Sequence, residues 1–115
     1  MGKDLGKVSI EDGQVRLGDL LLQLAFPAAD ARLIGERIVV LYDYMSGPGF
    51  RQFQNVEAFS PAGERLWTAQ HPTNETADAY FRFVSVEPLR LSNFVGFVCE
   101  LDPSTGRMLH AVFTK

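Results

Sequence analysis

A segment of strand, turn and strand occurs twice in this chain of 115 residues, and this repeat limits the fold more than any other feature. The first copy occupies residues 55–69 and the second residues 98–111, so that Gly106 follows Gly63 by 43 residues. An interval of about 40–45 residues is typical of repeated four-stranded units. A glycine supplies the positive φ that short turns often need. The repeat therefore predicts two antiparallel meanders, each with a bend at its glycine.

Apolar runs separated by turn residues predict about eleven strands and no stable helix. Residues 30–69 are expected to form the first meander and residues 81–113 the second, with further strands before residue 25. Apolar side chains alternate to both sides of residues 38–42, which is typical of a central strand that is buried on both faces.

The fold class predicted from this pattern is all-β, in one domain over residues 1–115. Neither meander can bury its apolar face alone, so we expect the two to pack as a sandwich or to curl into a barrel. The N-terminal strands are expected to complete a sheet.

The two copies resemble the repeat of pyrroloquinoline-quinone-type β-propellers. That repeat runs from an apolar residue and Asp through a short turn to Thr-Gly, a basic residue, an apolar residue and Trp. Residues 59–67 and 101–109 carry the resemblance; the first copy keeps Trp67, and the second has His110 where Trp would stand. True propellers have at least about four blades around a channel. The resemblance therefore implies a blade-like fold, and a quinone cofactor does not carry over.

The whole chain is also similar to a family of small bacterial β-proteins of unassigned function. The shared segments are Asn-x-x-Ala-Phe-x-x-x-Gly-x-x-x-Trp, here residues 55–67, and Asp-Pro-x-Thr-Gly, here residues 102–106. This likeness implies a fold and no activity. We expect no cofactor.

Charge and cysteine content limit the classes of partner and the location. The chain has 11 Lys and Arg, 14 Asp and Glu and a net charge of −3, without the basic cluster that nucleic acids or anionic membranes require. The apolar run at residues 20–26 is far shorter than the roughly 20 residues of a membrane span. A single cysteine, Cys99, fits a reducing compartment. These features predict a cytoplasmic protein that binds neither nucleic acid nor a membrane.

Catalytic and metal-binding motifs are weak. Cys99, His71 and Asp78 are the candidates for a catalytic role, but Cys99 is expected to fill the apolar face of a strand, and nothing in the sequence brings His71 or His110 near it. The chain contains no Cys-x-x-Cys or His-x-His spacing for zinc. No catalytic, cofactor or metal residue is assigned from the sequence.

Aromatic residues and an arginine gather around the loop at Gly47-Pro48-Gly49. Aromatic and Arg side chains are enriched in binding hot spots. The alternative is that the rings cap the end of the core. The predicted binding patch consists of Tyr42, Tyr44, Phe50, Arg51, Phe53 and Trp67.

Three functions remain open at this point. The favoured one is a non-enzymatic domain that binds another protein, or a second copy of itself, through a sheet edge or the Gly-Pro-Gly loop. The second is a binder of a small ligand or carbohydrate through the aromatic and Arg patch. A hydrolytic enzyme is the least favoured of the three.

Overall fold

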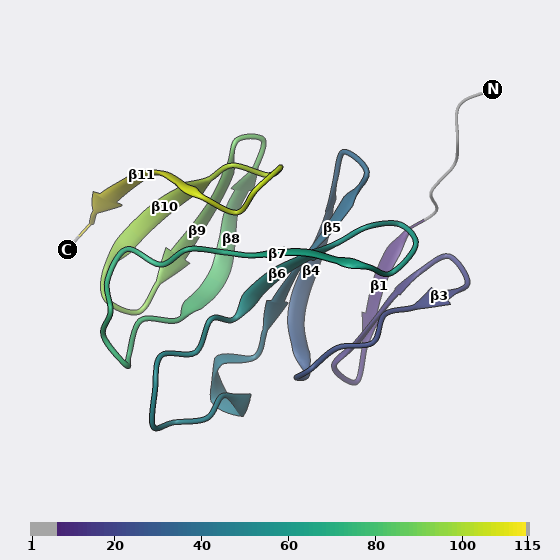
Figure 1. Ribbon diagram of the computed structural model, residues 1–115, viewed down its shortest axis with the longest axis horizontal. Helices are drawn as coiled ribbons and strands as arrows, with labels where there is room; N and C mark the ends of the chain where they lie inside the picture. The colour runs from purple at the N-terminus through teal and green to yellow at the C-terminus, as the bar shows by residue number, and fades with distance from the viewer. Residues whose placement is uncertain (1–6, 115) are drawn as a thin grey trace.

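The computed structural model describes residues 7–114 and shows an all-β protein whose described strands form three antiparallel sheets (Figure 1). The N-terminal sheet contains β1 (Val8–Glu11), β2 (Gln14–Leu17) and β3 (Leu20–Leu21). The first meander contains β4 (Ala28–Ile34), β5 (Arg37–Tyr42), β6 (Val56–Phe59) and β7 (Arg65–Thr68). The second meander contains β8 (Tyr80–Val86), β9 (Leu89–Asn93), β10 (Phe97–Leu101) and β11 (Met108–Phe113). The two predicted meanders are confirmed.

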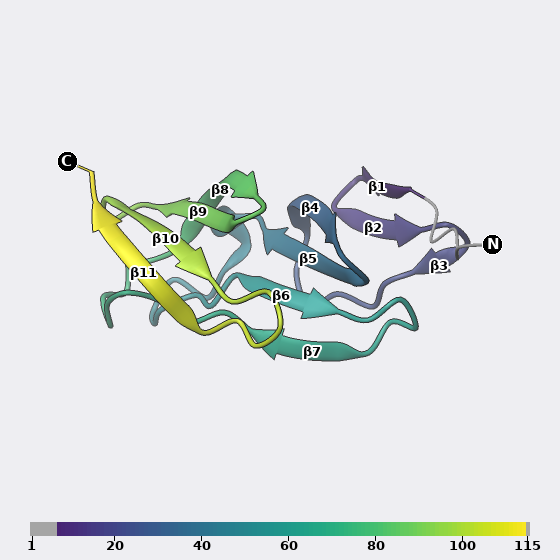
Figure 2. The same cartoon turned by 90° about the horizontal axis from the view of Figure 1, so that it is seen from above.

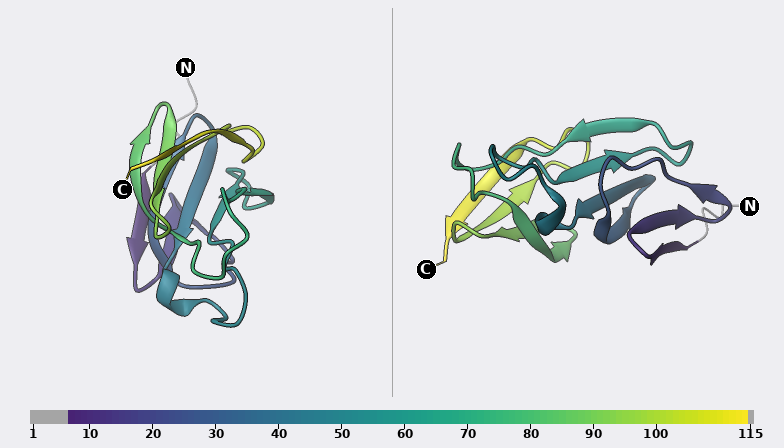
Figure 3. Two further views of the ribbon diagram at one scale, coloured as in Figure 1. Left: turned by 90° about the vertical axis from the view of Figure 1, so that its left-hand side faces the viewer. Right: turned by 90° about the horizontal axis from the view of Figure 1, so that it is seen from below.

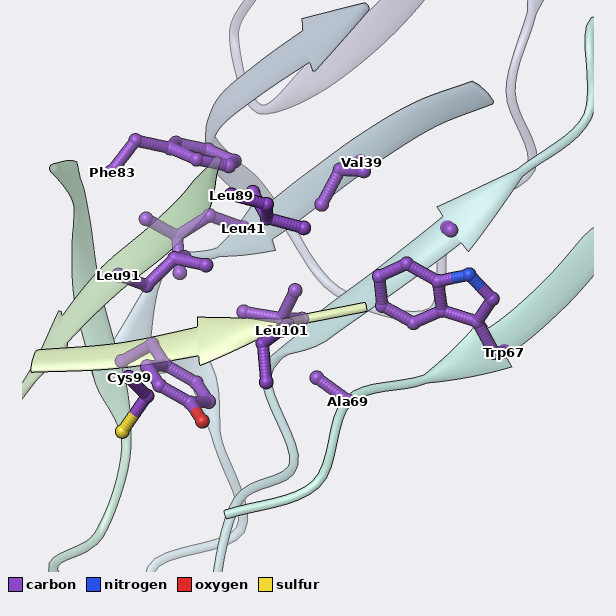
Figure 4. Close-up of a cluster of buried hydrophobic side chains, with 12 residues drawn as sticks. Val39, Leu41, Trp67, Ala69, Phe83, Leu89, Leu91, Cys99 and Leu101 are labelled. Carbon is purple, nitrogen blue, oxygen red and sulfur yellow. The ribbon is translucent and has the colours of Figure 1, made fainter. Parts of the chain in front are cut away.

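The three sheets are stacked in sequence order. The N-terminal sheet and the second meander lie at opposite ends, with the first meander between them (Figure 2, Figure 3). The core between the two meanders includes Val39 and Leu41 of β5, and Figure 4 shows side chains from both meanders in this core. The core beneath the N-terminal sheet includes Ile38, Val40 and Tyr42 of the same strand. This confirms the prediction that β5 is buried on both faces.

The N-terminal strands differ from the prediction, because they complete neither meander and form a sheet of their own. Val15, Leu17 and Leu22 are buried against the first meander. Because these side chains share one apolar face, they need a sheet face to cover them, which pairing at a sheet edge would not provide. A backbone hydrogen bond connects the β1–β2 turn to the start of β4: Ala28 N–H donates to the Gly13 carbonyl at 2.8 Å.

Trp67 joins the two meanders. Its side chain is in the core between them, and only 8% of the residue is exposed. The indole Nε1–H donates to the Pro103 carbonyl, in the turn between β10 and β11, at 3.0 Å. The ring lies directly against Gly106 of the same turn, where a Cβ atom would overlap it. Both predicted glycine bends are present, with φ of +90° at Gly63 and +75° at Gly106.

Asn55 makes a second, polar joint between the meanders. This side chain is fully buried. Its Nδ2 group donates to the carbonyls of Tyr42 at 3.1 Å and Tyr80 at 2.7 Å. Its Oδ1 accepts the Tyr80 N–H at 2.9 Å. One amide therefore satisfies backbone groups of β5 and of β8, the first strand of the second meander.

We expect Gly106→Ala to lower the free energy of unfolding by about 1–3 kcal/mol more than Gly49→Ala. Both glycines have positive φ, +75° and +81°, so that the backbone strain of an alanine is similar at the two positions. Only at Gly106 would the new methyl group meet a side chain, that of Trp67, whereas Gly49 has open space. Urea unfolding of both variants measures the difference. Equal losses would contradict a close contact between the turn and the indole.

Candidate binding groove between the meanders

The structure divides the predicted binding patch into two groups. Three of its residues are exposed: Tyr44, Phe50 and Arg51. The other three are buried, which corrects the expectation that they contribute to one surface: Tyr42, Phe53 and Trp67. Tyr42 lies on the face of β5 that the N-terminal sheet covers, and the Phe53 ring packs edge-on against Phe26 at 4.7 Å. Trp67 is in the other core, between the meanders.

Of the exposed residues, Tyr44 and Arg51 border a groove of about 580 Å³ between the loop after β5 and the segments that begin and end the β8–β9 hairpin. Most of the lining is apolar, and Arg51 is the one charged residue among the residues that line the groove. The lining residues are Tyr44, Met45, Gly47, Gly49, Arg51, Phe53, Thr76, Ala77, Ala79 and Phe94. Phe53 also lines the groove, although only 7% of the residue is exposed. The groove therefore combines residues from both meanders.

A row of three aromatic rings continues from the groove onto the second meander. The Tyr44 and Phe94 ring centroids are 4.5 Å apart, and those of Phe94 and Phe81 are 4.7 Å apart. Met45, which also lines the groove, is 76% exposed, and Phe50 of the same loop, next to Arg51, is 79% exposed. Large apolar side chains that gather on a surface usually mark a place where another molecule binds.

Met45, Phe81 and Phe94 were not among the predicted binding residues. Phe94 follows β9 in the tight turn that leads to β10. A phenylalanine in a short turn is an unusual choice, since turns favour Gly, Asn, Asp, Ser and Pro. That local signal could have identified Phe94. Its proximity to Tyr44 depends on how the two meanders pack, which the sequence does not show.

The loop that forms one wall of the groove is held by local contacts. Asp43 precedes the short helix η1 (Tyr44–Ser46), and its Oδ1 accepts the Met45 N–H at 2.9 Å. The Phe53 ring covers Gly47 so closely that no side chain fits there. Gln52 crosses to the opposite wall, where its Nε2 donates to the Thr73 carbonyl at 2.7 Å. The loop does not depend on a ligand for these contacts, so the groove is formed in the free protein.

A buried carboxylate lies under the other side of the same loop. Glu57 Oε1 accepts the Tyr42 hydroxyl at 2.7 Å, and its Oε2 accepts Thr68 Oγ1 at 2.9 Å and Arg65 at 3.3 Å. Burial and then the bond to Glu57 raise the pKa of Tyr42 above its ordinary value, so this phenol stays protonated and donates. These bonds connect β5, β6 and β7, and they use both carboxylate oxygens within the fold.

The residues considered for catalysis are buried as well. His71 Nδ1 lies 3.1 Å from Asp78 Oδ1, so that two of the three candidates are brought together. Asp78 also accepts from the Asn93 side chain and from Thr73. Cys99 is fully buried, and burial raises the pKa of its thiol to about 11, with a further increase from Asp78. The thiol is therefore protonated near neutral pH, which does not suit a nucleophile.

Two further observations concern metals and membranes. Within residues 7–114, no group of three or more His, Cys, Asp and Glu side chains is arranged to hold a metal ion. In the same part of the chain, no helix has the length and apolar character needed to cross a membrane.

The chain was compared with known proteins. A family model described as "Domain of unknown function (DUF7957)" matches residues 5–113. This range contains every strand that the structure describes. No curated protein and no solved structure matches the chain.

Proposed function

This chain belongs to the family described as Domain of unknown function (DUF7957), whose description names no activity, and we propose that it is a protein-binding domain. In this proposal, a segment of another protein places an apolar side chain in the groove between the meanders. The binding is not accompanied by a reaction. The protein acts in the cytoplasm. Its single cysteine, Cys99, is free and buried, which is compatible with this location.

The observation that carries this proposal is the exposed aromatic row beside an apolar hollow. Tyr44, Phe94 and Phe81 contact one another in the free protein, so little conformational freedom is lost when a partner covers them. Rigid aromatic side chains contribute a large contact area at low entropic cost, and they are frequent hot spots of interfaces.

Arg51 indicates what the partner carries next to its apolar side chain. It is exposed, with its guanidinium over the Phe50 ring at 5.7 Å from the ring centre. A guanidinium group at the rim of an apolar groove favours a carboxylate, which it can bind with two hydrogen bonds. We infer that the recognised segment has an aromatic or aliphatic residue close to an Asp or Glu.

A carbohydrate or a small polar ligand is the alternative occupant of the same groove. Such a ligand needs several side chains with which to form hydrogen bonds. Among the residues that line the groove, only Tyr44, Arg51 and Thr76 have polar side-chain groups. The composition of the lining therefore favours an apolar side chain of a protein over a sugar.

Selection from a random peptide library on the immobilised protein tests the proposal. We expect enriched peptides to contain an aromatic or aliphatic residue near an acidic one. Phe94→Ala should lose these peptides, because it removes the middle ring of the row. Arg51→Glu should keep the apolar requirement and reverse the charge preference to Lys or Arg. Fluorescence anisotropy of one labelled peptide gives the dissociation constants.

Leu66→Ala is the matched control, since Leu66 is an exposed apolar residue on β7 that does not line the groove. It should bind the peptides as the unmodified protein does. Enrichment of peptides that bind Phe94→Ala equally well would exclude this groove as the site. A library that yields no enriched sequence, together with a sugar that raises the melting temperature of the unmodified protein only, would support the carbohydrate alternative.

A further inference from the structure

A second surface, separate from the groove, lies at the outer edge of the second meander. The strand order there is β11-β10-β9-β8, so β11 is paired on one side only (Figure 2). We propose that two copies of the chain associate by pairing their β11 strands antiparallel about a two-fold axis, which joins the two second meanders into one continuous sheet. This inference does not depend on the proposed function of the groove.

The hydrogen-bond pattern shows which backbone groups of β11 point outward. Thr114 N–H donates to the Gly96 carbonyl at 2.8 Å, across the β10–β11 pair. Backbone groups alternate in direction along an antiparallel strand, so the N–H and C=O groups of Val112 also point to β10. Ala111 and Phe113 then direct their N–H and C=O groups away from the sheet. Within residues 7–114 these groups have no hydrogen-bond partner, so they can pair with another strand.

The start of this edge is already used within the chain. Gln70 Oε1 accepts the Met108 N–H at 2.6 Å, and the Gln70 N–H donates to the Gly106 carbonyl at 2.9 Å. A register shift leaves Leu109 without a partner between Met108 and His110, so the regular, free part of β11 is residues 110–113. Four residues are within the usual range of strand lengths.

Apart from the irregularity at Leu109, β11 lacks the usual protection against edge pairing. Proteins block free strand edges with charged residues, proline or bulges. Among the described strands, only β11 and the two-residue β3 contain no Lys, Arg, Asp or Glu. Leu109, Val112 and Phe113 of β11 are also exposed apolar residues. The other described edge strands of four residues or more are β1, β4, β7 and β8, and they contain Glu11, Asp30, Arg65 and Arg82.

A second copy is the occupant that fits this edge. When two copies of β11 pair antiparallel about a two-fold axis, the same strand provides both sides of the contact. The outward N–H and C=O groups of Ala111 and Phe113 can therefore form hydrogen bonds with those of the partner copy. The net charge of the chain is −3, but β11 itself contributes no Lys, Arg, Asp or Glu to the contact. Pairing would cover apolar side chains without bringing like charges together.

Light scattering after gel filtration over a concentration series tests the association. We expect the unmodified chain to have the mass of two copies at high concentration and of one copy on dilution. Val112→Lys should raise the dissociation constant of the dimer about tenfold or more, because symmetry places two new charges in one contact. Leu66→Lys is the matched control on the edge strand β7, since Leu66 and Val112 are both 47% exposed.

Hydrogen exchange of the unmodified chain gives a second test that needs no variant. The amides of Ala111 and Phe113 should become protected only at concentrations where the dimer forms, while the amides of Val112 and Thr114 stay protected throughout. A monomer at every concentration would overturn the proposal. A dimer that Val112→Lys leaves intact, or one without protection at Ala111 and Phe113, would also overturn it, because the contact would lie elsewhere.

Discussion

Trp67→Ala is expected to lower the free energy of unfolding by about 3–5 kcal/mol, which is a large part of the stability of a small domain. The substitution removes a buried ring from the core between the meanders. It also removes the donor that satisfies the Pro103 carbonyl and leaves a cavity next to Gly106. Urea unfolding, followed by far-ultraviolet circular dichroism, measures the loss.

Leu66→Ala is the control for this prediction, because Leu66 is adjacent in β7 and about half-exposed. Its cost should be below about 1 kcal/mol, as for most surface substitutions. A loss for Trp67→Ala no larger than that of Leu66→Ala would show that the ring does not join the meanders. Combined with Gly106→Ala, the two losses should not add, since removing the indole makes room for the new methyl group.

Asn55→Ala is expected to lower the free energy of unfolding by about 3 kcal/mol, at roughly 1 kcal/mol for each of three lost hydrogen bonds. The backbone groups that lose their partner belong to Tyr42 and Tyr80. Asn55 is fully buried, so bulk water does not reach these groups. The exposed Asn74 provides the control, and Asn74→Ala should change stability little.

For Asn55→Asp, the loss in the free energy of unfolding is expected to depend on pH. The carboxylate would face two carbonyl oxygens in a buried site, so its pKa in the folded state would rise above the ordinary value of about 3.9. The added loss of stability should be smallest in acid, where the carboxyl group is protonated in both states. It should grow as the pH rises above about 4. A loss that is constant from acid to neutral pH would show that Asn55 does not donate to these carbonyls.

The meanders could be predicted from the sequence because their signals are local. Gly63 and Gly106 mark the turns, and the 43-residue interval between them relates the two copies. The apolar residues on both sides of β5 indicated a central strand, as observed. The place of the N-terminal sheet could not be predicted in this way. An apolar strand face shows that something must cover it, and does not show which sheet does so.

The binding groove was predicted only in part, for a physical reason. Tyr44 and Arg51 are close in sequence to the Gly-Pro-Gly loop, so a local cluster was visible. Whether a ring in that cluster points to the core or to solvent depends on strand register and packing. Tyr42 and Phe53 therefore could not be distinguished from Tyr44 before the structure was known. Phe94 reaches Tyr44 from the other meander, and no local pattern connects them.

The burial of β5 on both faces has a consequence for how this strand finds its place. A slip of one residue would exchange its two sets of apolar side chains, yet valine, isoleucine and leucine suit either core. Hydrophobicity alone therefore distinguishes poorly between the correct register of β5 and a register shifted by one residue. The selection is left to polar contacts at the end of the strand, where the Tyr42 hydroxyl meets Glu57 and the Tyr42 carbonyl meets Asn55. A few hydrogen bonds at the end of this apolar strand therefore help to fix the register of β5.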